Sequence, residues 1–134
     1  MLRARDIMNK KVICIKKDAY ILEAVQLVVE NNISCLPVVK DDMTLIGMLS
    51  EKDAVTLYYE FEDIENQTVS DYMTSPVVSF EEDKTVLDVC DFLTRNIFRR
   101  VPITSNGKLT GIISIRDVLD HILQREREKL ANVH

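Results

Sequence analysis

The sequence predicts a mixed α+β fold built from two copies of one β-α-β-β-α unit, on three observations. First, shifting the sequence by 65 residues places Asp6 on Asp71, and a shift of 64 places Gly47 on Gly111. Second, each copy alternates short aliphatic runs of strand length with longer segments of helical apolar spacing. Third, 134 residues with 46% apolar and 29% charged side chains suit a globular chain of two small units.

The repeat also predicts the domain boundaries. The first unit is expected over residues 4–60 and the second over residues 69–124, joined by an acidic, polar linker at 61–68. Residues 125–134 carry mixed charges and are expected to form a helical extension. Because a unit of about 60 residues buries too little surface to be stable alone, we expect the two copies to pack together.

Both units are expected to contain the same elements in the same order, from an opening helical turn to a closing helix. In the first copy these are a turn at 4–8, a strand at 12–15, a helix at 21–31, strands at 36–39 and 45–49, and a helix from residue 50. In the second copy the corresponding ranges are 69–73, 77–80, 86–96, 101–104 and 109–113, with a helix from residue 114. Asp18 and Asp83 are expected to cap the first helices, and Asn106-Gly107 to form a two-residue hairpin turn.

The helix expected over residues 21–31 carries more apolar side chains than a single core-facing stripe requires. Either this helix is fully buried within the chain, or its second face packs on another subunit. Tyr58, Tyr59 and Phe61 add apolar surface with polar tips, which is typical of interfaces. We therefore predict a homodimer.

Composition and charge exclude several classes of protein. No apolar run approaches the roughly 18 residues that span a bilayer, and the N-terminus lacks the pattern of a signal peptide. The 22 acidic and 17 basic side chains give a net charge of -5, which argues against a nucleic-acid binder. A basic stretch within residues 1–17 leaves nucleic-acid binding as an alternative, but this stretch is short and lacks aromatic residues.

The reactive side chains form no catalytic or metal-binding pattern. Cys14, Cys35 and Cys90 are odd in number and not in metal-ligand spacing, so neither a disulfide framework nor a metal site is expected. Free cysteines without an export signal indicate a cytoplasmic protein. There is no Ser/His/Asp set, no P-loop and, once both copies are placed, no room for a catalytic domain, so we expect a protein that is not an enzyme and needs no cofactor.

The best-matched stretches have the pattern Gly-h-h-Ser-x-x-Asp, where h is apolar, and lie at residues 47–53 and 111–117. In each, a strand runs directly into a helix. Ser and Asp at this spacing form a capping-box-like helix start, which is a purely structural role. The same residues suit a nucleotide, because a helix N-terminus and a hydroxyl favour phosphate and a carboxylate accepts from ribose hydroxyls. Both interpretations stay open at this point.

With these motifs the chain resembles a tandem pair of CBS (cystathionine beta-synthase) domains, often called a Bateman module. The resemblance covers residues 4–124 and includes Asp-Ile-Met and Asp-Tyr-Met at the start of the copies, and the Leu-Pro-Val-Val and Val-Pro-Ile-Thr runs at 36–39 and 101–104. It implies two copies packed through their sheets with pseudo-twofold symmetry. It also implies clefts that bind an adenosine compound: AMP, ADP, ATP or S-adenosylmethionine.

Carried over residue by residue, the resemblance makes Asp53 and Asp117 ribose ligands and places Ser50 and Ser114 beside the phosphate. It further assigns the base pocket to the strand before the first helix and to the apolar run around each proline. These residues are Ile13, Ile15, Leu36, Pro37 and Val38 in the first copy, and Val78, Phe80, Val101, Pro102 and Ile103 in the second. Packing in the core is the alternative for each of them.

The two expected sites differ in charge. The second copy has Arg99, Arg100 and Arg116 near its motif, whereas Glu51 in the first copy would repel a phosphate. The alternative for these arginines is a solvated surface. We expect the second copy to bind the more phosphorylated ligand more tightly.

The leading functional hypothesis is a regulatory, energy-sensing module that binds an adenine nucleotide and signals through self-association or an unidentified effector protein. The alternative is a structural or protein-interaction module whose clefts bind no nucleotide.

Overall fold

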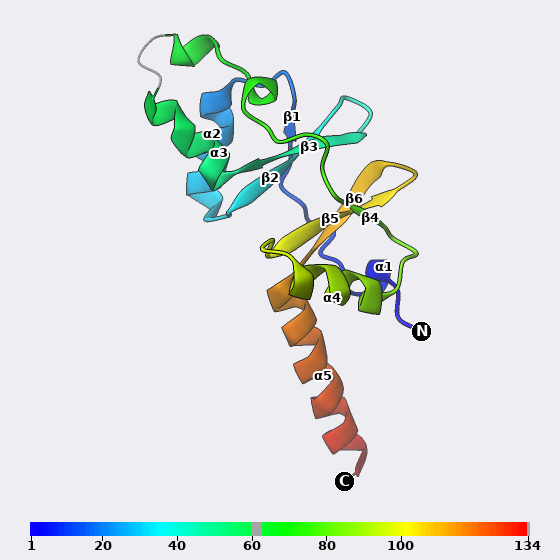
Figure 1. Ribbon diagram of the computed structural model, residues 1–134. Coiled ribbons are helices and arrows are strands. Elements are labelled where there is room, and N and C mark those ends of the chain that lie inside the picture. The colour runs from blue at the N-terminus through cyan, green and yellow to red at the C-terminus, as the bar shows by residue number, and fades with distance from the viewer. Residues whose placement is uncertain (60–62, 134) are drawn as a thin grey trace. The chain divides into compact units, whose positions relative to one another are not determined.

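The computed structural model describes residues 1–59 and 63–133 (Figure 1). Phe61, one of the residues expected at a subunit contact, lies outside the described residues. The mixed α+β class is confirmed, because each copy contains a small three-stranded sheet with helices. Within the described residues, no helix is both long enough and apolar enough to cross a bilayer.

The chain divides into two compact units that do not follow the repeat. One unit consists of Met1–Val12, Val78–Asn106 and Thr110–His134, and the other of Ile13–Val77 and Gly107–Leu109. The opening segment of the first copy therefore folds with the second copy. The opening segment of the second copy folds with the first.

The unit that contains most of the first copy is built around a sheet of order β1-β2-β3. Its elements are β1 (Ile15–Lys16), α2 (Ile21–Asn31), β2 (Cys35–Val39), β3 (Leu45–Ser50), α3 (Glu51–Val55) and the 3₁₀ helices η1 (Thr56–Tyr59), η2 (Ile64–Asn66) and η3 (Val69–Asp71). β1 is parallel to β2, and β2 is antiparallel to β3. Its core cluster is Ile15, Ile21, Ala24, Val28, Leu36, Val38, Leu49 and Val69.

The other unit repeats this arrangement with a sheet of order β4-β5-β6. Its elements are α1 (Ala4–Ile7), β4 (Phe80–Glu81), α4 (Val86–Arg95), β5 (Arg100–Ser105), β6 (Lys108–Ser114, whose first two residues fall in the other unit) and α5 (Ile115–Val133). The core cluster is Ala4, Val89, Leu93, Val101, Ile103 and Ile113. In Figure 1, α5 runs from orange to red and continues well beyond the sheet that precedes it.

The expected caps of the first helices are wrong by two residues. The residues at the N-cap positions of α2 and α4 are Tyr20 and Thr85, and the Thr85 hydroxyl accepts the Asp88 N–H at 3.2 Å. Asp18 lies outside the helix, where its carboxylate binds the Lys17 ammonium at 3.1 Å. The register of the apolar stripe decides the start of each helix, since burial of that stripe outweighs one capping bond.

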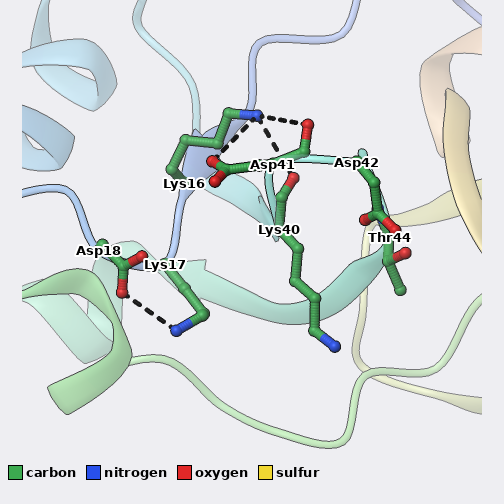
Figure 2. A network of polar contacts seen from close by, with 7 residues as sticks. All are labelled: Lys16, Lys17, Asp18, Lys40, Asp41, Asp42 and Thr44. Atoms are coloured by element: carbon green, nitrogen blue, oxygen red, sulfur yellow. Dashed lines mark hydrogen bonds and ion pairs between the residues drawn. The ribbon is translucent and has the colours of Figure 1, made fainter.

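Equivalent residues on β1 and β4 restrain the turns that follow the neighbouring strands β2 and β5, and these residues carry opposite charges. Lys16 Nζ donates to the carbonyls of Lys40 and Asp41, at 3.3 Å each, and lies 3.9 Å from the Asp41 carboxylate (Figure 2). Its counterpart in the second copy is Glu81, whose carboxylate accepts from the Thr104 hydroxyl and, at 2.7 Å, from the Asn106 N–H. The turn is thus restrained in both copies, although lysine provides the restraint in one and glutamate in the other.

These two restraints should differ in strength. We expect Glu81→Ala to lower the free energy of unfolding by about 1–3 kcal/mol, because the buried Thr104 hydroxyl loses its acceptor. Lys16→Ala should cost less than about 1 kcal/mol, since this side chain is half-exposed. Urea unfolding at pH 7 measures both, with Glu81→Gln as the control that keeps an acceptor oxygen. A loss from Lys16→Ala equal to that from Glu81→Ala would contradict this expectation.

Candidate functional site

Ser50 and Asp53 form a complete capping box where β3 runs into α3. The Asp53 N–H donates to Ser50 Oγ at 3.1 Å, and the Ser50 N–H donates to Asp53 Oδ2 at 2.9 Å. The same box recurs between β6 and α5, with distances of 3.0 and 2.8 Å between Asp117 and Ser114. The structural interpretation of the motif is therefore correct. It leaves room for a ligand, because a carboxylate has about four acceptor positions and the box uses one of them.

Each box is flanked by the opening segment of the other copy, which pairs with the strand before the box. Thr74 and Met48 exchange both backbone hydrogen bonds, at 2.9 and 3.0 Å. Asn9 and Ile112 do the same in the other unit. The Asp-x-Met starts and the Gly-h-h-Ser-x-x-Asp motifs are thus neighbours in space within each unit.

The methionines of these opening segments explain the glycines of the motif. A Cβ on Gly47 would lie 2.7 Å from Met73 Sδ and 3.0 Å from the Thr74 carbonyl oxygen. A Cβ on Gly111 would lie 2.7 Å from Met8 Cγ and 3.0 Å from Met8 Cβ. A side chain at either glycine would therefore push the opening segment away from the strand and from the capping box.

Thr74 is a neighbour of the candidate site that was not predicted from the sequence. Its hydroxyl lies 3.3 Å and 3.4 Å from the two carboxylate oxygens of Asp53. The repeat aligns Thr74 with Asn9, so a comparison of the copies at this position would have been the signal. Local spacing does not reveal the contact, because the two residues are 21 positions apart.

Most residues expected in the base pocket are buried in their own unit. Leu36, Pro37, Val38, Ile15, Val101, Pro102 and Ile103 are buried, and Phe80 packs on the second core with its ring edge against Phe92. Ile13 and Val78, which occupy equivalent positions, keep exposed apolar surface. Contact with a ligand stays a prediction for all ten.

Arg99 and Arg100 lie where β5 begins, beside the start of α5. The Ile115 N–H donates to the Arg99 carbonyl at 2.9 Å, and Arg100 Nε is buried without a hydrogen-bond partner in the described part of the chain. Arg99 and Arg116 have exposed side chains. In the first copy the equivalent backbone bond joins Glu51 to Ser34, so no guanidinium occupies this place. The two copies therefore have the same backbone hydrogen bond at this place and differ in the charge of the neighbouring side chains.

The cysteines form no disulfide in the described part of the chain. Burial raises the pKa of the Cys14 thiol, against the opposing effect of Lys16. Burial, with the Asp91 carboxylate, also raises the pKa of Cys90. Among the described residues no group of three or more His, Cys, Asp or Glu side chains is arranged to hold a metal ion.

Gly111→Ala should destabilise the protein by about 1–3 kcal/mol, because the new methyl group overlaps Met8. Urea unfolding measures the loss. Gly107→Asn is the control for backbone strain without a steric overlap, since Gly107 has open space around it and a φ of +81°, at which asparagine is among the least strained side chains. Adding Met8→Ala to Gly111→Ala should cost less than the two single losses combined; strictly additive losses would show that the contact does not matter.

Comparison with known proteins matches both copies to one family. Residues 4–60 and 69–124 match the family model of the CBS domain. The chain is 35% identical over 115 residues to an uncharacterised protein of Methanocaldococcus jannaschii, covering 86% of this chain and 41% of that protein. It is 36% identical over 122 residues to an uncharacterised 17.7 kDa protein of Acidianus ambivalens, covering 90% of this chain and 73% of the relative.

A solved structure supports the same assignment. CBSX2, a CBS-pair protein from Arabidopsis thaliana that was crystallised in complex with AMP, matches with a TM-score of 0.84 and 26% sequence identity. The match covers 94% of this chain and 99% of that one. With both of its repeats matched by the family model, this chain belongs to the CBS-domain family, as a tandem pair of CBS domains.

Proposed function

We propose that this chain is a regulatory module that binds adenosine nucleotides at its two Ser-x-x-Asp junctions. The observation that carries the proposal is the repetition of one complete capping box, Ser50 with Asp53 and Ser114 with Asp117, in a chain related to a protein crystallised with AMP. In each box the carboxylate retains acceptor positions for the two ribose hydroxyls. The serine hydroxyl and the helix N–H groups lie on the phosphate side.

The second junction takes the more phosphorylated ligand in this proposal. Arg99 lies beside the start of α5, and Arg100 Nε lacks a protein acceptor in the described residues, so a phosphate there would complete its hydrogen bonding. Glu51 occupies the first position of α3, where its charge opposes a phosphate. The copies would then respond to different nucleotides.

Nucleotide binding is tested by calorimetry on Asp53→Asn and Asp117→Asn, because asparagine keeps an acceptor for the serine N–H and preserves the cap. We expect Asp117→Asn to weaken ATP binding by about tenfold or more, and Asp53→Asn to weaken it much less. Glu128→Gln, on the exposed end of α5, is the matched control for loss of one carboxylate. Equal losses of ATP affinity from both substitutions would contradict the assignment of the sites.

The second candidate function is a protein-interaction module without a nucleotide. It is favoured by the capping boxes, which account for both serines and both aspartates, and by the burial of most base-pocket candidates. A thermal-shift screen with AMP, ADP, ATP and S-adenosylmethionine separates the two functions. A ligand at 100 times its dissociation constant adds about 2.7 kcal/mol of stability, and no shift with any of the four would favour the interaction module.

We further propose that the module is a cytoplasmic homodimer that passes its signal to an effector protein. The helical segments that close the copies, α3 with η1 and α5, expose apolar side chains at repeat-equivalent positions: Val55 and Leu119, Tyr58 and Ile122, Tyr59 and Leu123. Leu22 and Val29 on the outer face of α2 are also exposed, so this helix is only partly buried within the described chain. Such a duplicated apolar surface suits an isologous interface. Cysteines that form no disulfide in the described residues suit a reducing compartment.

Leu119→Ser combined with Ile122→Ser should lower the mass measured by light scattering from twice 15.4 kDa to 15.4 kDa. The helix should stay folded, because Leu119 is 53% exposed and Ile122 47% exposed in the single chain. Arg127→Ser, on the charged part of α5, controls for loss of a helix-favouring side chain. A wild-type protein that is monomeric at tens of micromolar would refute the homodimer.

A further inference from the structure

Backbone pairing holds Thr74 beside the carboxylate of Asp53. Its backbone exchanges two hydrogen bonds with Met48 on β3, and the next residue, Ser75, donates its hydroxyl to the Ile46 carbonyl at 3.0 Å. The Thr74 side chain is exposed, yet its hydroxyl points to both Asp53 oxygens, at 3.3 and 3.4 Å. The hydroxyl therefore reaches a carboxylate that is already fixed at one oxygen by the capping box.

The second copy has the same backbone geometry without this hydroxyl. Asn9 exchanges two hydrogen bonds with Ile112, at 2.9 and 3.0 Å, as Thr74 does with Met48. The Asn9 side chain instead accepts the N–H of Lys11 at 3.0 Å, within its own loop. In the described residues, the hydrogen bond recorded at the Asp117 carboxylate comes from the Ser114 N–H. Asp53 thus has one hydrogen-bond donor, the Thr74 hydroxyl, that has no counterpart at Asp117 in the described residues.

We propose that Thr74 is a positioning residue for ribose recognition in the first copy. Its hydroxyl holds the plane of the Asp53 carboxylate, so that the remaining acceptor positions face the 2′- and 3′-hydroxyls of a nucleotide. This inference rests on the proposed nucleotide-binding function. It makes the first junction selective for the sugar, while the arginines make the second junction selective for the phosphates.

Two donors leave enough acceptor capacity for a diol. A carboxylate has about four lone-pair positions, and the Ser50 N–H and the Thr74 hydroxyl engage about two of them. The capping bond holds Oδ2, and the Thr74 hydroxyl adds a second donor within reach of both oxygens, so the plane of the carboxylate is held from two sides. A ligand that meets a preoriented acceptor loses less rotational freedom on binding, which raises affinity.

The test compares Thr74→Val, which removes the hydroxyl and keeps the shape, with Thr74→Ser, which keeps the hydroxyl. Both are made in the full chain with Asp117→Asn, so that calorimetry reports the first junction. The ligands are AMP and 2′,3′-dideoxy-AMP, which lacks the diol. We expect Thr74→Val to weaken AMP binding about three- to tenfold, Thr74→Ser to change it less than about twofold, and neither to change binding of the dideoxy ligand.

The outcomes separate this inference from the proposed function. Equal weakening of AMP and dideoxy-AMP by Thr74→Val would mean a merely structural role and would overturn the inference. Unchanged or tighter AMP binding by Thr74→Val would overturn it as well, while leaving nucleotide binding intact. If the wild-type chain binds no adenosine nucleotide, the proposed function fails, and the inference fails with it. The reciprocal change, Asn9→Thr in a chain with Asp53→Asn, should strengthen AMP binding relative to the dideoxy ligand; no gain in that ratio would count against the role of the hydroxyl.

Discussion

The structure depends on the pairing of each opening segment with a strand of the other copy. Ala4 and Val69 lie in these segments, and each is fully buried in the core of the unit that it joins. A single copy would lack this buried residue and would leave unpaired the strand edge that the opening segment covers. The methionine seated on the motif glycine belongs to the same contact. Two copies are therefore needed to complete each unit, beyond the general instability of a unit of about 60 residues.

This exchange could not be predicted from the repeat. The shift of 65 residues identifies which residues are equivalent, but equivalence does not show which copy each segment packs against. Local elements are different, because their signals lie within a few residues of one another. The helix expected over 21–31 is present with those bounds, since its apolar spacing and the left-handed Asn32 at its end are local features. The caps expected at Asp18 and Asp83 failed because a favourable cap residue does not fix where a helix begins.

In the candidate site, too, contacts between residues close in sequence could be predicted and contacts between distant residues could not. The serine and aspartate of each motif are three residues apart, and their reciprocal bonds follow from that spacing. Thr74 reaches Asp53 across 21 residues, through strand pairing that no local pattern encodes. The apolar base-pocket candidates had two interpretations from the start, and burial of Leu36 and Val101 favours the core. Sequence alone could not separate these interpretations, because valine and leucine suit both places.

The two copies have diverged in side chains while their backbones stayed alike. Lys16 and Glu81 restrain equivalent turns with opposite charges, and Thr74 and Asn9 keep equivalent pairings with different side-chain bonds. Divergence of this kind changes what a site prefers without moving it. A regulatory module needs a ligand to distinguish two states of the protein, and under the proposed function two junctions of equal backbone geometry but unequal chemistry would let two ligands do so. The capping boxes provide the fixed frame, because a carboxylate bound to the backbone keeps its place while its neighbours vary.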